Sequence, residues 1–509
     1  MIFTKPPHIR SMIKTRYITV LFLVLACRAS LAAQTYGDVL KRNFWNASTN
    51  VTGIRQDSLS RSYALIGGSY TGGGFKDPSD AADLWSAGIE TASIRHLKNI
   101  SFRGSFAFTQ TEFYSMCGSM FIEPGFYPLD ILEFTPGRKT RQDYAFDGGL
   151  SYDAGAHWRI GVDIDFKAAN LAKRKDLRHS NLRLDLEVAP GVMCHYGKFA
   201  AGLSAIFSKN SESVNPEQVG TSETSYYAFL DKGMMYGAYG PWNGGALHLD
   251  ESGVTGFPMR EYGYGAALQA QYGGFFAEVK WIHSKGRAGE KENIWFRFPG
   301  DEVGITAGYG RNGHFARLAL SRKSTETEET ILEKVSENGV QTVRETGSNI
   351  IGIRQIWSVA PEYEYMADFW EIKAGAVLER TLNVSATMYP YLFSRQLSQW
   401  EAYVAGTLHP GRFDIGIELG YAGGNLSEES SLMDENSGVQ TVPFRLEDWY
   451  KLQTEWLVSG RIRAGLNLRC NFKNGMYINA QASLLHGFGV KLLGGSNRVC
   501  AELGFGYNF

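Results

Sequence analysis

The feature that most constrains the fold of this chain is an alternation of apolar and polar residues with a period of two. Between residues 158 and 166, Trp, Ile, Val, Ile and Phe alternate with Arg, Gly, Asp and Asp. The same pattern recurs in residues 182–188, 262–272, 412–421 and 465–472. Successive side chains of a strand point to opposite faces, so the pattern predicts half-buried β-strands. No stretch of comparable length shows a helical period, and an all-β chain is expected.

The composition excludes two other classes. The 509 residues include 58 Gly, 30 Phe, 26 Tyr and 11 Trp, but only 15 Pro. Hydrophobic residues make up 44% and the mean hydropathy is −0.22, whereas a polytopic helical membrane protein needs repeated apolar runs of about 20 residues. A disordered chain would have few aromatics and a high net charge. A large, glycine- and aromatic-rich β protein remains.

The N-terminus has the order of a secretory signal peptide. Four basic residues and no acidic ones precede an apolar run at 17–26, and small residues follow at 29–33. The apolar run is too short to span a bilayer, and cleavage after Ala32 or Ala33 is expected. The sequence Val24–Cys27 partly matches a bacterial lipoprotein box and is the alternative. We therefore expect a signal peptide at 1–33, a periplasmic segment at 34–59 and one barrel domain at 60–509.

Charge and cysteine content limit the expected partners. Residues 1–33 contain five basic and no acidic residues, so the mature chain has 46 basic against 52 acidic residues. A mildly acidic chain gives no reason to expect nucleic-acid binding. The four remaining cysteines, Cys117, Cys194, Cys470 and Cys500, are too sparse for a disulfide framework and have no zinc-site spacing. One or two disulfides and buried free thiols remain as alternatives.

Two patterns favour a transmembrane antiparallel β-barrel over a soluble β-sandwich. Aromatic residues begin or end many apolar faces, as interfacial aromatic girdles require. Tight and long connections also alternate, as expected for short periplasmic turns and long extracellular loops. Tight connections are predicted at 153–156, 194–197, 273–274, 311–314, 409–411 and 473–475, and long ones near 114–141, 213–258, 288–301, 425–446 and 487–496. Pro190 and Pro361 weaken the two strands in which they fall, because proline cannot donate to a ladder.

The last strand is predicted with the clearest alternation. Val499, Ala501, Leu503, Phe505, Tyr507 and Phe509 face one way, and the chain ends on Phe509. This segment resembles the C-terminal strand of bacterial outer-membrane barrels, whose terminal aromatic residue is read by the barrel assembly machinery. The resemblance implies that Phe505, Tyr507 and Phe509 act as an assembly signal in outer-membrane lipid. About 14–18 strands are expected, with 18 as the best count and the first strand near 61–71.

Two short segments, both expected in loops, have similar sequences. Residues 337–343, which contain Asn338-Gly339, are similar to residues 435–442. Asn-Gly is a strong hairpin signal, so both segments are predicted tips of protruding external hairpins.

Charged residues of both signs are predicted to face the lumen. Arg159, Asp163, Arg183, Asp185, Lys280 and Glu418 are examples. A selective pore generally presents a ring of one sign. Mixed signs with many small glycines favour ion pairing in a partly filled lumen over an open path for solutes.

Two apolar loops are the candidate binding or plug segments. Residues 213–258 contain Tyr226, Tyr227, Phe229, Tyr236, Tyr239 and Trp242, and residues 114–141 contain Phe121, Phe126 and Tyr127. These aromatics could stack on a sugar ring, line an apolar ligand path or plug the barrel. So many exposed apolar residues would promote aggregation unless they fold inward or meet a partner, which favours a plug or a partner surface.

Enzymatic and metal chemistry have weak support. His179, His248, His283 and His486 fall toward the expected external side and could meet around a metal or haem, but their spacing does not indicate a site. No G-x-S-x-G, Walker or H-E-x-x-H motif is present. We expect no catalytic residues, metal or cofactor.

Across nearly the whole mature chain, the sequence resembles the uncharacterised outer-membrane β-barrel proteins of Bacteroidota. The resemblance rests on residues 35–40, 43–46, 64–68 and 504–509, and implies no catalytic or binding residue. The first functional hypothesis is a barrel that passes or captures a small or apolar solute. The alternative is an accessory or structural barrel that partners another cell-envelope complex, and an outer-membrane hydrolase is the third class.

Overall fold

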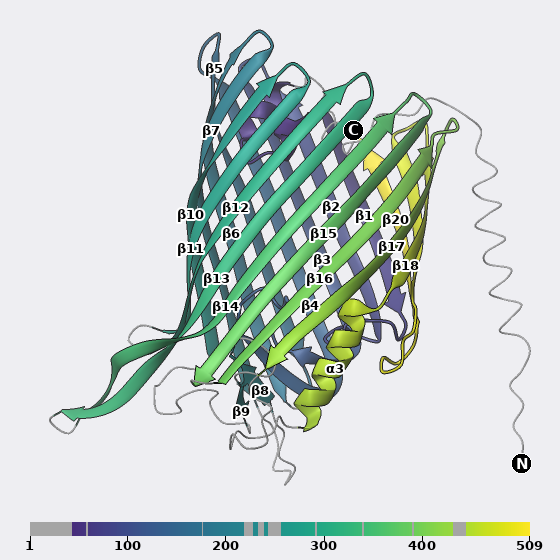
Figure 1. The fold of residues 1–509 in the computed structure, drawn as a ribbon. Helices are drawn as coiled ribbons and strands as arrows, with labels where there is room; N and C mark the ends of the chain where they lie inside the picture. The colour runs from purple at the N-terminus through teal and green to yellow at the C-terminus, as the bar shows by residue number, and fades with distance from the viewer. Residues whose placement is uncertain are drawn as a thin grey trace, which may run out of the picture.

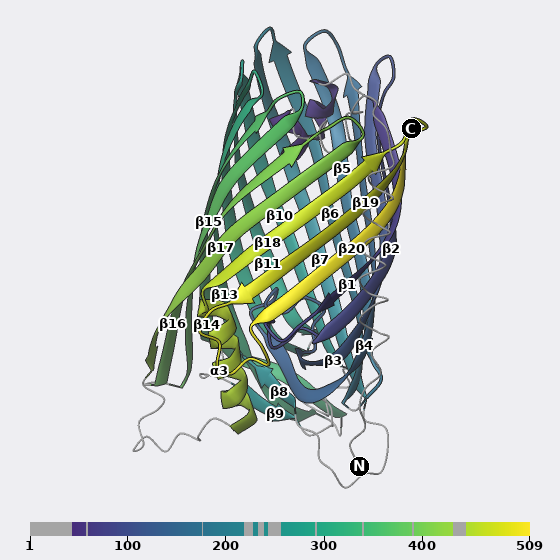
Figure 2. The ribbon, with the colours of Figure 1, turned by 90° about the vertical axis from the view of Figure 1, so that its right-hand side faces the viewer.

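The computed structural model shows a single antiparallel barrel wall (Figures 1 and 2). It describes residues 43–56, 60–175, 177–217, 228–232, 239–242, 256–290, 293–337, 340–388, 391–430 and 444–509. The expected signal peptide at 1–33 lies outside these residues.

The first half of the wall consists of β1 (Arg61–Gly72), β2 (Asp83–His96), β3 (Ile100–Ser119), β4 (Asp130–Asp153), β5 (Trp158–Lys173), β6 (Arg178–Tyr196), β7 (Phe199–Glu217), β10 (Phe257–Tyr272) and β11 (Phe275–Glu290). The second half consists of β12 (Asn293–Arg311), β13 (His314–Glu337), β14 (Val340–Met366), β15 (Trp370–Met388), β16 (Tyr391–Leu408), β17 (Phe413–Ser430), β18 (Arg461–Asn471), β19 (Met476–Gly487) and β20 (Asn497–Asn508).

The wall is closed, which confirms the predicted 18-stranded barrel. Each strand pairs with its neighbours along the chain, and β7 pairs with β10. β1 pairs with β20, so the first and last strands complete the cylinder. Ser62 and Phe509 exchange two backbone hydrogen bonds at this seam. Closure removes the unpaired edges that an open sheet would expose.

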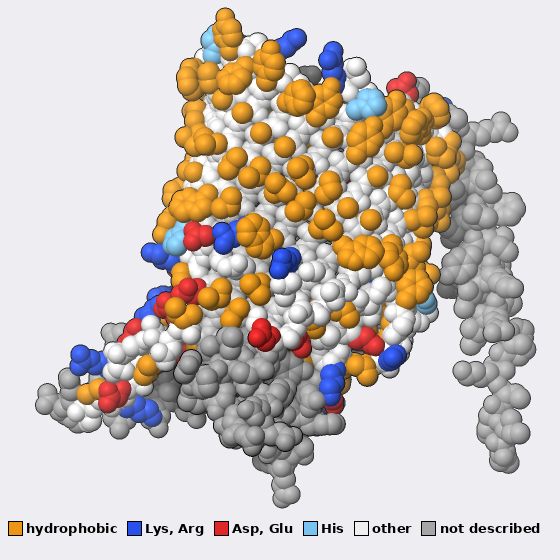
Figure 3. All heavy atoms as spheres, viewed as in Figure 1, with side chains coloured by type: hydrophobic (Ala, Val, Ile, Leu, Met, Phe, Trp, Pro, Cys, Tyr) orange, Lys and Arg blue, Asp and Glu red, His pale blue; other side chains and the backbone are white. Residues whose placement is uncertain are grey.

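The period-two pattern places apolar side chains on the outside of the wall. Trp158, Ile160, Ile164 and Phe166 on β5 are exposed, as are Phe505, Tyr507 and Phe509 at the end of the chain. Figure 3 shows hydrophobic side chains in a broad outer band, with most charged side chains gathered toward one end. In water such a surface would be an aggregation liability, whereas lipid accommodates it.

The two ends of the barrel differ in their connections, and we name them accordingly. The turn end carries the short connections, including the predicted turns at 153–156, 194–197, 311–314 and 473–475. Asn312 (φ 52°) and Gly313 (φ 80°) both adopt positive φ, as a two-residue Asn-Gly hairpin requires. The opposite end is the loop end. It includes the connection 120–129 and, between β7 and β10, the small hairpin β8 (Ala228–Asp231) and β9 (Tyr239–Trp242), which pairs with β4.

Two local predictions are corrected. The long connection predicted near 288–301 is wrong, since β11 continues to Glu290 and β12 starts at Asn293. These strands extend beyond the apolar outer band, where outward residues need not be apolar and a polar strand resembles a loop in the sequence. Pro190 and Pro361 do lie within strands β6 and β14. Each interrupts the ladder on one side only: Pro190 has no partner on β7, and Pro361 has none on β15.

A helix that the sequence pattern did not predict precedes β18. Helix α3 (Phe444–Val458) buries Trp449 and Tyr450 against Leu132 and Phe229 at the loop end. Glu455 accepts backbone N–H bonds from residues 491–493, which fixes the helix to the β19–β20 connection. Within the described part of the chain, no helix is both long and apolar enough to cross a membrane.

Strand length varies around the wall. β1 and β18 to β20 are 11 or 12 residues long, whereas β13 has 24 residues and β14 has 27. The long pair extends away from the barrel as a protruding hairpin (Figure 1). Its tip joins Glu337 to Val340, so the first predicted hairpin tip is confirmed. The second one, at 435–442, lies outside the described residues.

Candidate functional site

The turn end of the lumen contains the N-terminal segment, which we call the turn-end plug (residues 43–56). It forms the 3-10 helices η1 (Phe44–Ala47) and η2 (Val51–Gln56), seen inside the upper part of the barrel in Figure 1. Asn43 caps η1 by accepting the Trp45 backbone N–H with its side chain. Trp45 is 1% exposed and packs edge-on against Phe276. The segment N-terminal to β1 therefore folds into the lumen.

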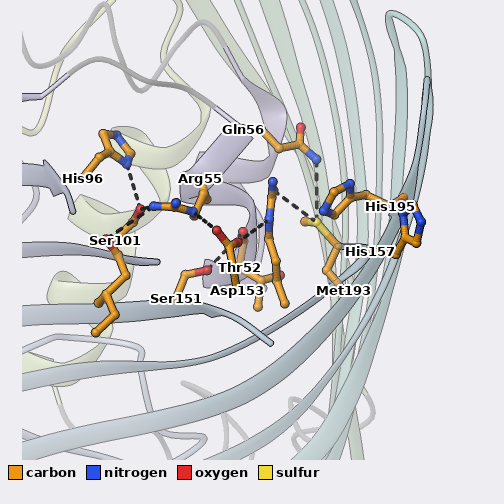
Figure 4. A network of polar contacts seen from close by, with 12 residues as sticks. Thr52, Arg55, Gln56, His96, Ser101, Ser151, Asp153, His157, Met193 and His195 are labelled. Atoms are coloured by element: carbon orange, nitrogen blue, oxygen red, sulfur yellow. Dashed lines mark hydrogen bonds and ion pairs between the residues drawn. The ribbon is translucent and has the colours of Figure 1, made fainter. Parts of the chain in front are cut away.

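Polar contacts connect the turn-end plug to the wall. Arg55 forms an ion pair with Asp153 and donates to the carbonyls of Leu97 and Lys98 (Figure 4). Deeper in the lumen, the Asn50 amide donates to the Val192 carbonyl and to Gln269, both at 3.1 Å. Thr49 donates its backbone N–H to Glu278 at 2.9 Å. Trp45 also donates its indole N–H to Gln271.

Glycines on the inner face of the wall make room for this plug. A Cβ at Gly191 or Gly202 would lie 2.6 Å from the Asn50 amide, and one at Gly308 would lie 2.8 Å from the Phe44 ring. Gly149 and Gly161 face Val51 in the same way. These five residues on β4, β5, β6, β7 and β12 form a glycine cradle. Any larger residue there would compete with the plug for the same space.

The loop end is filled by an inward-folded connection, which we call the loop-end plug (residues 120–129). The Met120 carbonyl accepts from Asn181 at 2.8 Å, and the Ile122 N–H donates to Glu212 at 2.8 Å. On the far side of the lumen, Arg354 of β14 donates to the Gly125 carbonyl at 2.6 Å. The connection therefore crosses the barrel from β3 and β4 to β14.

The aromatic residues of the two predicted binding or plug loops do not form a single group. Phe121 and Tyr127 are buried in one apolar cluster with Phe257, Trp295 and Phe298, and Phe126 packs against its edge. Phe229 is buried beside Trp449 in a second cluster. Tyr239 and Trp242 belong to β9, which is described by its backbone, and Tyr226, Tyr227 and Tyr236 lie outside the described residues.

The six predicted lumen charges each have an oppositely charged neighbour. Arg159 pairs with Asp153 at 3.1 Å, Asp163 with Arg103 at 2.6 Å, and Lys280 with Glu302 at 3.0 Å. Arg183 pairs with Asp185 at 2.9 Å, and Glu418 pairs with Arg463 at 2.8 Å. The mixed signs predicted from the sequence correspond to ion pairs within one strand, as for Arg183 and Asp185, or between strands, as for Lys280 and Glu302.

One part of the inner wall is not covered by either plug, and we call it the open arc. It comprises the inward faces of β16 to β20 with β1 and β2. Its polar residues include Arg463, Asn467, Gln481, Glu502 and Glu90, which are exposed, and Glu401 and Glu418, which are partly exposed. Glu418 and Arg463 have side chains 41% and 44% exposed, although both point into the barrel. By contrast, Ser204 and Gln269, which face the turn-end plug, are at most 3% exposed.

The start of β4 carries an unusual carboxyl group. Asp130 lies beyond the lipid-facing residues of its strand, directly after the loop-end plug, and accepts a hydrogen bond from Ser119 at 2.7 Å. Burial raises the pKa of Asp130 to about 7, with a further increase from Asp231 on β8, although the Ser119 and Ile131 donors oppose it. Part of the Asp130 population is therefore protonated at neutral pH.

The predicted histidine group does not assemble. His179 is buried and hydrogen-bonded to Asn181, His283 contacts Asp301, and His486 contacts Asn497. His248 lies outside the described residues. Among the described residues, no three His, Cys, Asp or Glu side chains are placed to hold a metal ion. The four described cysteines, Cys117, Cys194, Cys470 and Cys500, form no disulfide with one another.

Sequence reasoning missed the plug residues Trp45, Asn50 and Arg55. Their wall partners are remote in sequence, as with Trp45 and Gln271. The available signal was the run of inward-facing glycines, which indicated a close approach from inside the barrel. It also missed α3, for which the spacing of Trp449, Leu452 and Trp456 was the available signal.

Comparison with solved structures finds barrels of low similarity. The ferric preacinetobactin receptor BauA from Acinetobacter baumannii aligns with a TM-score of 0.42 and 4% identity, over 89% of this chain and 80% of that one. OccAB3 of the same organism aligns with a TM-score of 0.35 and 8% identity, over 88% of this chain and 99% of that one. The toluene transporter TodX of P. putida aligns with a TM-score of 0.28 and 10% identity, over 90% of this chain and 92% of that one.

Sequence comparisons are more specific. A search of curated proteins finds no significant match. A family model described as a family of unknown function, DUF6850, matches residues 51–509, which comprise the whole barrel and the second helix of the turn-end plug. The chain therefore belongs to the DUF6850 family.

Proposed function

We propose that this protein is a bacterial outer-membrane barrel that admits small solutes along its open arc. In this proposal the turn end faces the periplasm and the loop end faces the exterior, as the short and long connections favour. Lipid surrounds the apolar outer band. Phe505, Tyr507 and Phe509, exposed on the outside of the seam, act as the signal for the barrel assembly machinery.

The observation that carries the proposal is the asymmetry of the lumen. The turn-end plug is seated on the glycine cradle, while Glu418, Arg463, Gln481 and Glu502 remain exposed on the other side. A barrel with a purely structural role would gain from filling this side with packed apolar residues. Polar side chains that face a water-accessible space are typical of a solute path.

Liposome swelling with the purified full-length chain tests this proposal. Gly465 faces the open arc and has space for a side chain, since its nearest neighbour would be the Glu418 Cβ at 3.6 Å. We expect Gly465→Trp to reduce the flux of small sugars and amino acids because it narrows the path. Ala501→Trp is the matched control, because Ala501 is exposed on the outer face of β20. Absence of swelling with the parent protein, or equal flux with Gly465→Trp, contradicts the proposal.

One observation favours the second candidate, an accessory barrel that docks a cell-envelope partner. The protruding β13–β14 hairpin exposes Ile331 and Ile350 beyond the barrel. A partner that covers them would explain their exposure. Under this alternative, a protein should co-purify in stoichiometric amount and be lost when the hairpin is shortened.

A further inference from the structure

Three polar residues form a row across the inner wall beneath the loop-end plug. Arg354 on β14 pairs in register with Asn383 on β15, which pairs in register with Arg395 on β16. Neighbouring strands lie about 5 Å apart, so the two arginines stand about 10 Å from each other with the amide between them. All three side chains line one cavity of about 340 Å³ at the loop end of the lumen.

Several polar atoms in this cavity lack a partner within the described part of the protein. The Arg354 guanidinium donates through Nη1 to the Gly125 carbonyl, but its buried Nε has no acceptor. The buried Oδ1 of Asn383 and Oε1 of Gln453 have no donor. Unsatisfied buried groups cost about 1–3 kcal/mol each, and native structures contain few of them. A bound molecule that supplies both donors and acceptors would satisfy all three.

The opposite wall of the cavity is apolar. Trp449, Tyr450 and Leu457 contribute from α3, and Pro128 and Leu129 contribute from the loop-end plug. A pocket with an aromatic wall facing a few convergent polar groups is typical of a small-molecule site, and its volume lies at the lower end of that class. The ligand therefore has an apolar face as well as polar edges.

Charge narrows the ligand class. Arg354 and Arg395 are accompanied in the lining by four carboxylate residues, Asp77, Asp130, Asp231 and Glu379. This balance disfavours an anion. Two of the carboxylates already accept hydrogen bonds within the protein, Asp130 from Ser119 and Asp77 from the Ser79 backbone N–H, which disfavours a cation as well. Hydroxyl groups both donate and accept, and so they fit an arginine Nε next to an amide oxygen.

We propose that this cavity binds a neutral polyhydroxylated solute, a monosaccharide or disaccharide, with its hydroxyls on the Arg354–Asn383–Arg395 row and its apolar face against α3. This inference rests on the proposed function and names the solute class. Gln399 of β16 lines the cavity, and Glu401, the next inward residue of the same strand, lines an adjoining cavity of about 310 Å³ with Arg463. The site therefore lies next to the open arc along β16.

Isothermal titration calorimetry of the full-length protein, in a detergent without a sugar headgroup, tests this inference. The probes are glucose, galactose, maltose and lactose, with gluconate and glucosamine as charged analogues. We expect at least one neutral sugar to bind saturably and more tightly than either charged analogue. Arg354→Met and Asn383→Leu should each weaken binding about tenfold, the effect of losing roughly one hydrogen bond in a desolvated site. Gln110→Leu is the matched control, because Gln110 is exposed on the same side of β3 as the outward-facing Phe106, and heat-modifiable gel migration verifies folding.

Three outcomes would overturn the inference: no binding of any neutral sugar, preferential binding of gluconate or glucosamine, and equal affinity in the folded row variants and the parent. The swelling assay separates this inference from the proposed function. Sugar binding without solute flux contradicts the channel and leaves the site intact, whereas flux without binding contradicts the site alone.

Discussion

The two plugs fill the same lumen with different chemistry. The turn-end plug rests on a glycine cradle and is joined to the wall by polar contacts from Asn50, Thr49 and Arg55. The loop-end plug is embedded in an apolar cluster of buried aromatic residues that includes Phe121 and Tyr127. Directional hydrogen bonds fix one position, whereas apolar packing depends mainly on buried area. The comparison teaches that side-chain hydrogen bonds of the plug itself are prominent at the turn end, whereas the loop-end plug contributes mainly its backbone and a larger set of buried aromatic rings.

The largest expected effect is at Trp45, the largest buried apolar side chain of the turn-end plug. Trp45→Ala removes a fully buried indole and should destabilise docking of the plug by about 3–5 kcal/mol. Trypsin cleavage after Arg55 in the folded barrel measures this change. Trp158→Ala is the control, because Trp158 is exposed on the outer face at the same end. Equal resistance of Trp45→Ala and the parent would show that the polar contacts alone hold the plug.

A paired substitution tests whether polar contacts matter more at the turn end. Asn50→Leu removes an amide that is 0% exposed and leaves its partners unsatisfied, which should cost about 1–3 kcal/mol. Tyr127→Phe removes only the hydroxyl donated to Asn210 and keeps the ring packed, so about 0.5–1.5 kcal/mol is expected. Hydrogen exchange of residues 43–56 and 120–129 reports each loss separately. The comparison fails if Tyr127→Phe opens its plug more than Asn50→Leu opens the other.

A further prediction is a pH dependence confined to the loop end. The pKa of Asp130 is raised from 3.8 to about 7, so its contribution to stability is fully present at low pH and is lost as the pH rises between these two values. Protection of residues 120–129 from hydrogen exchange should therefore fall between about pH 4 and pH 7 and level off above pH 7, after correction for intrinsic rates. Asp130→Asn should remove this dependence. A pH response that persists in the variant would assign it to neighbours such as Asp231 or Glu212.

The sequence was sufficient for the wall because every strand contributes to one apolar outer band. Outward residues such as Trp158 and Phe505 are apolar, so alternation, strand count and the first strand could be predicted. Beyond that band the alternation ends, which is why the predicted strands at β11 and β12 were too short. The identity of the plug residues depends on contacts between distant segments, as between Trp45 and Gln271, and periodicity carries no information about such pairs.

The candidate sugar site could not be predicted from the sequence for the same reason: it depends on contacts between distant segments. Arg354, Asn383 and Arg395 come together only through the registers of β14, β15 and β16, and none stands out in its own strand. Their importance appears once α3 is in place, and the helix was missed because its residues follow no long regular pattern. The sequence showed that residues 121–127 are apolar, but it did not show which strands they contact.

The order of segments along the chain has a consequence for biogenesis. The turn-end plug precedes β1, and four of the five cradle glycines lie in β4 to β7, early in the sequence. The seam joins β1 to β20, so the cylinder shuts only when the final strand arrives. The N-terminal segment can therefore be enclosed while the wall is still an open sheet, and it need not be threaded into a finished barrel. Assembly in this order makes the plug a template around which the first strands curve.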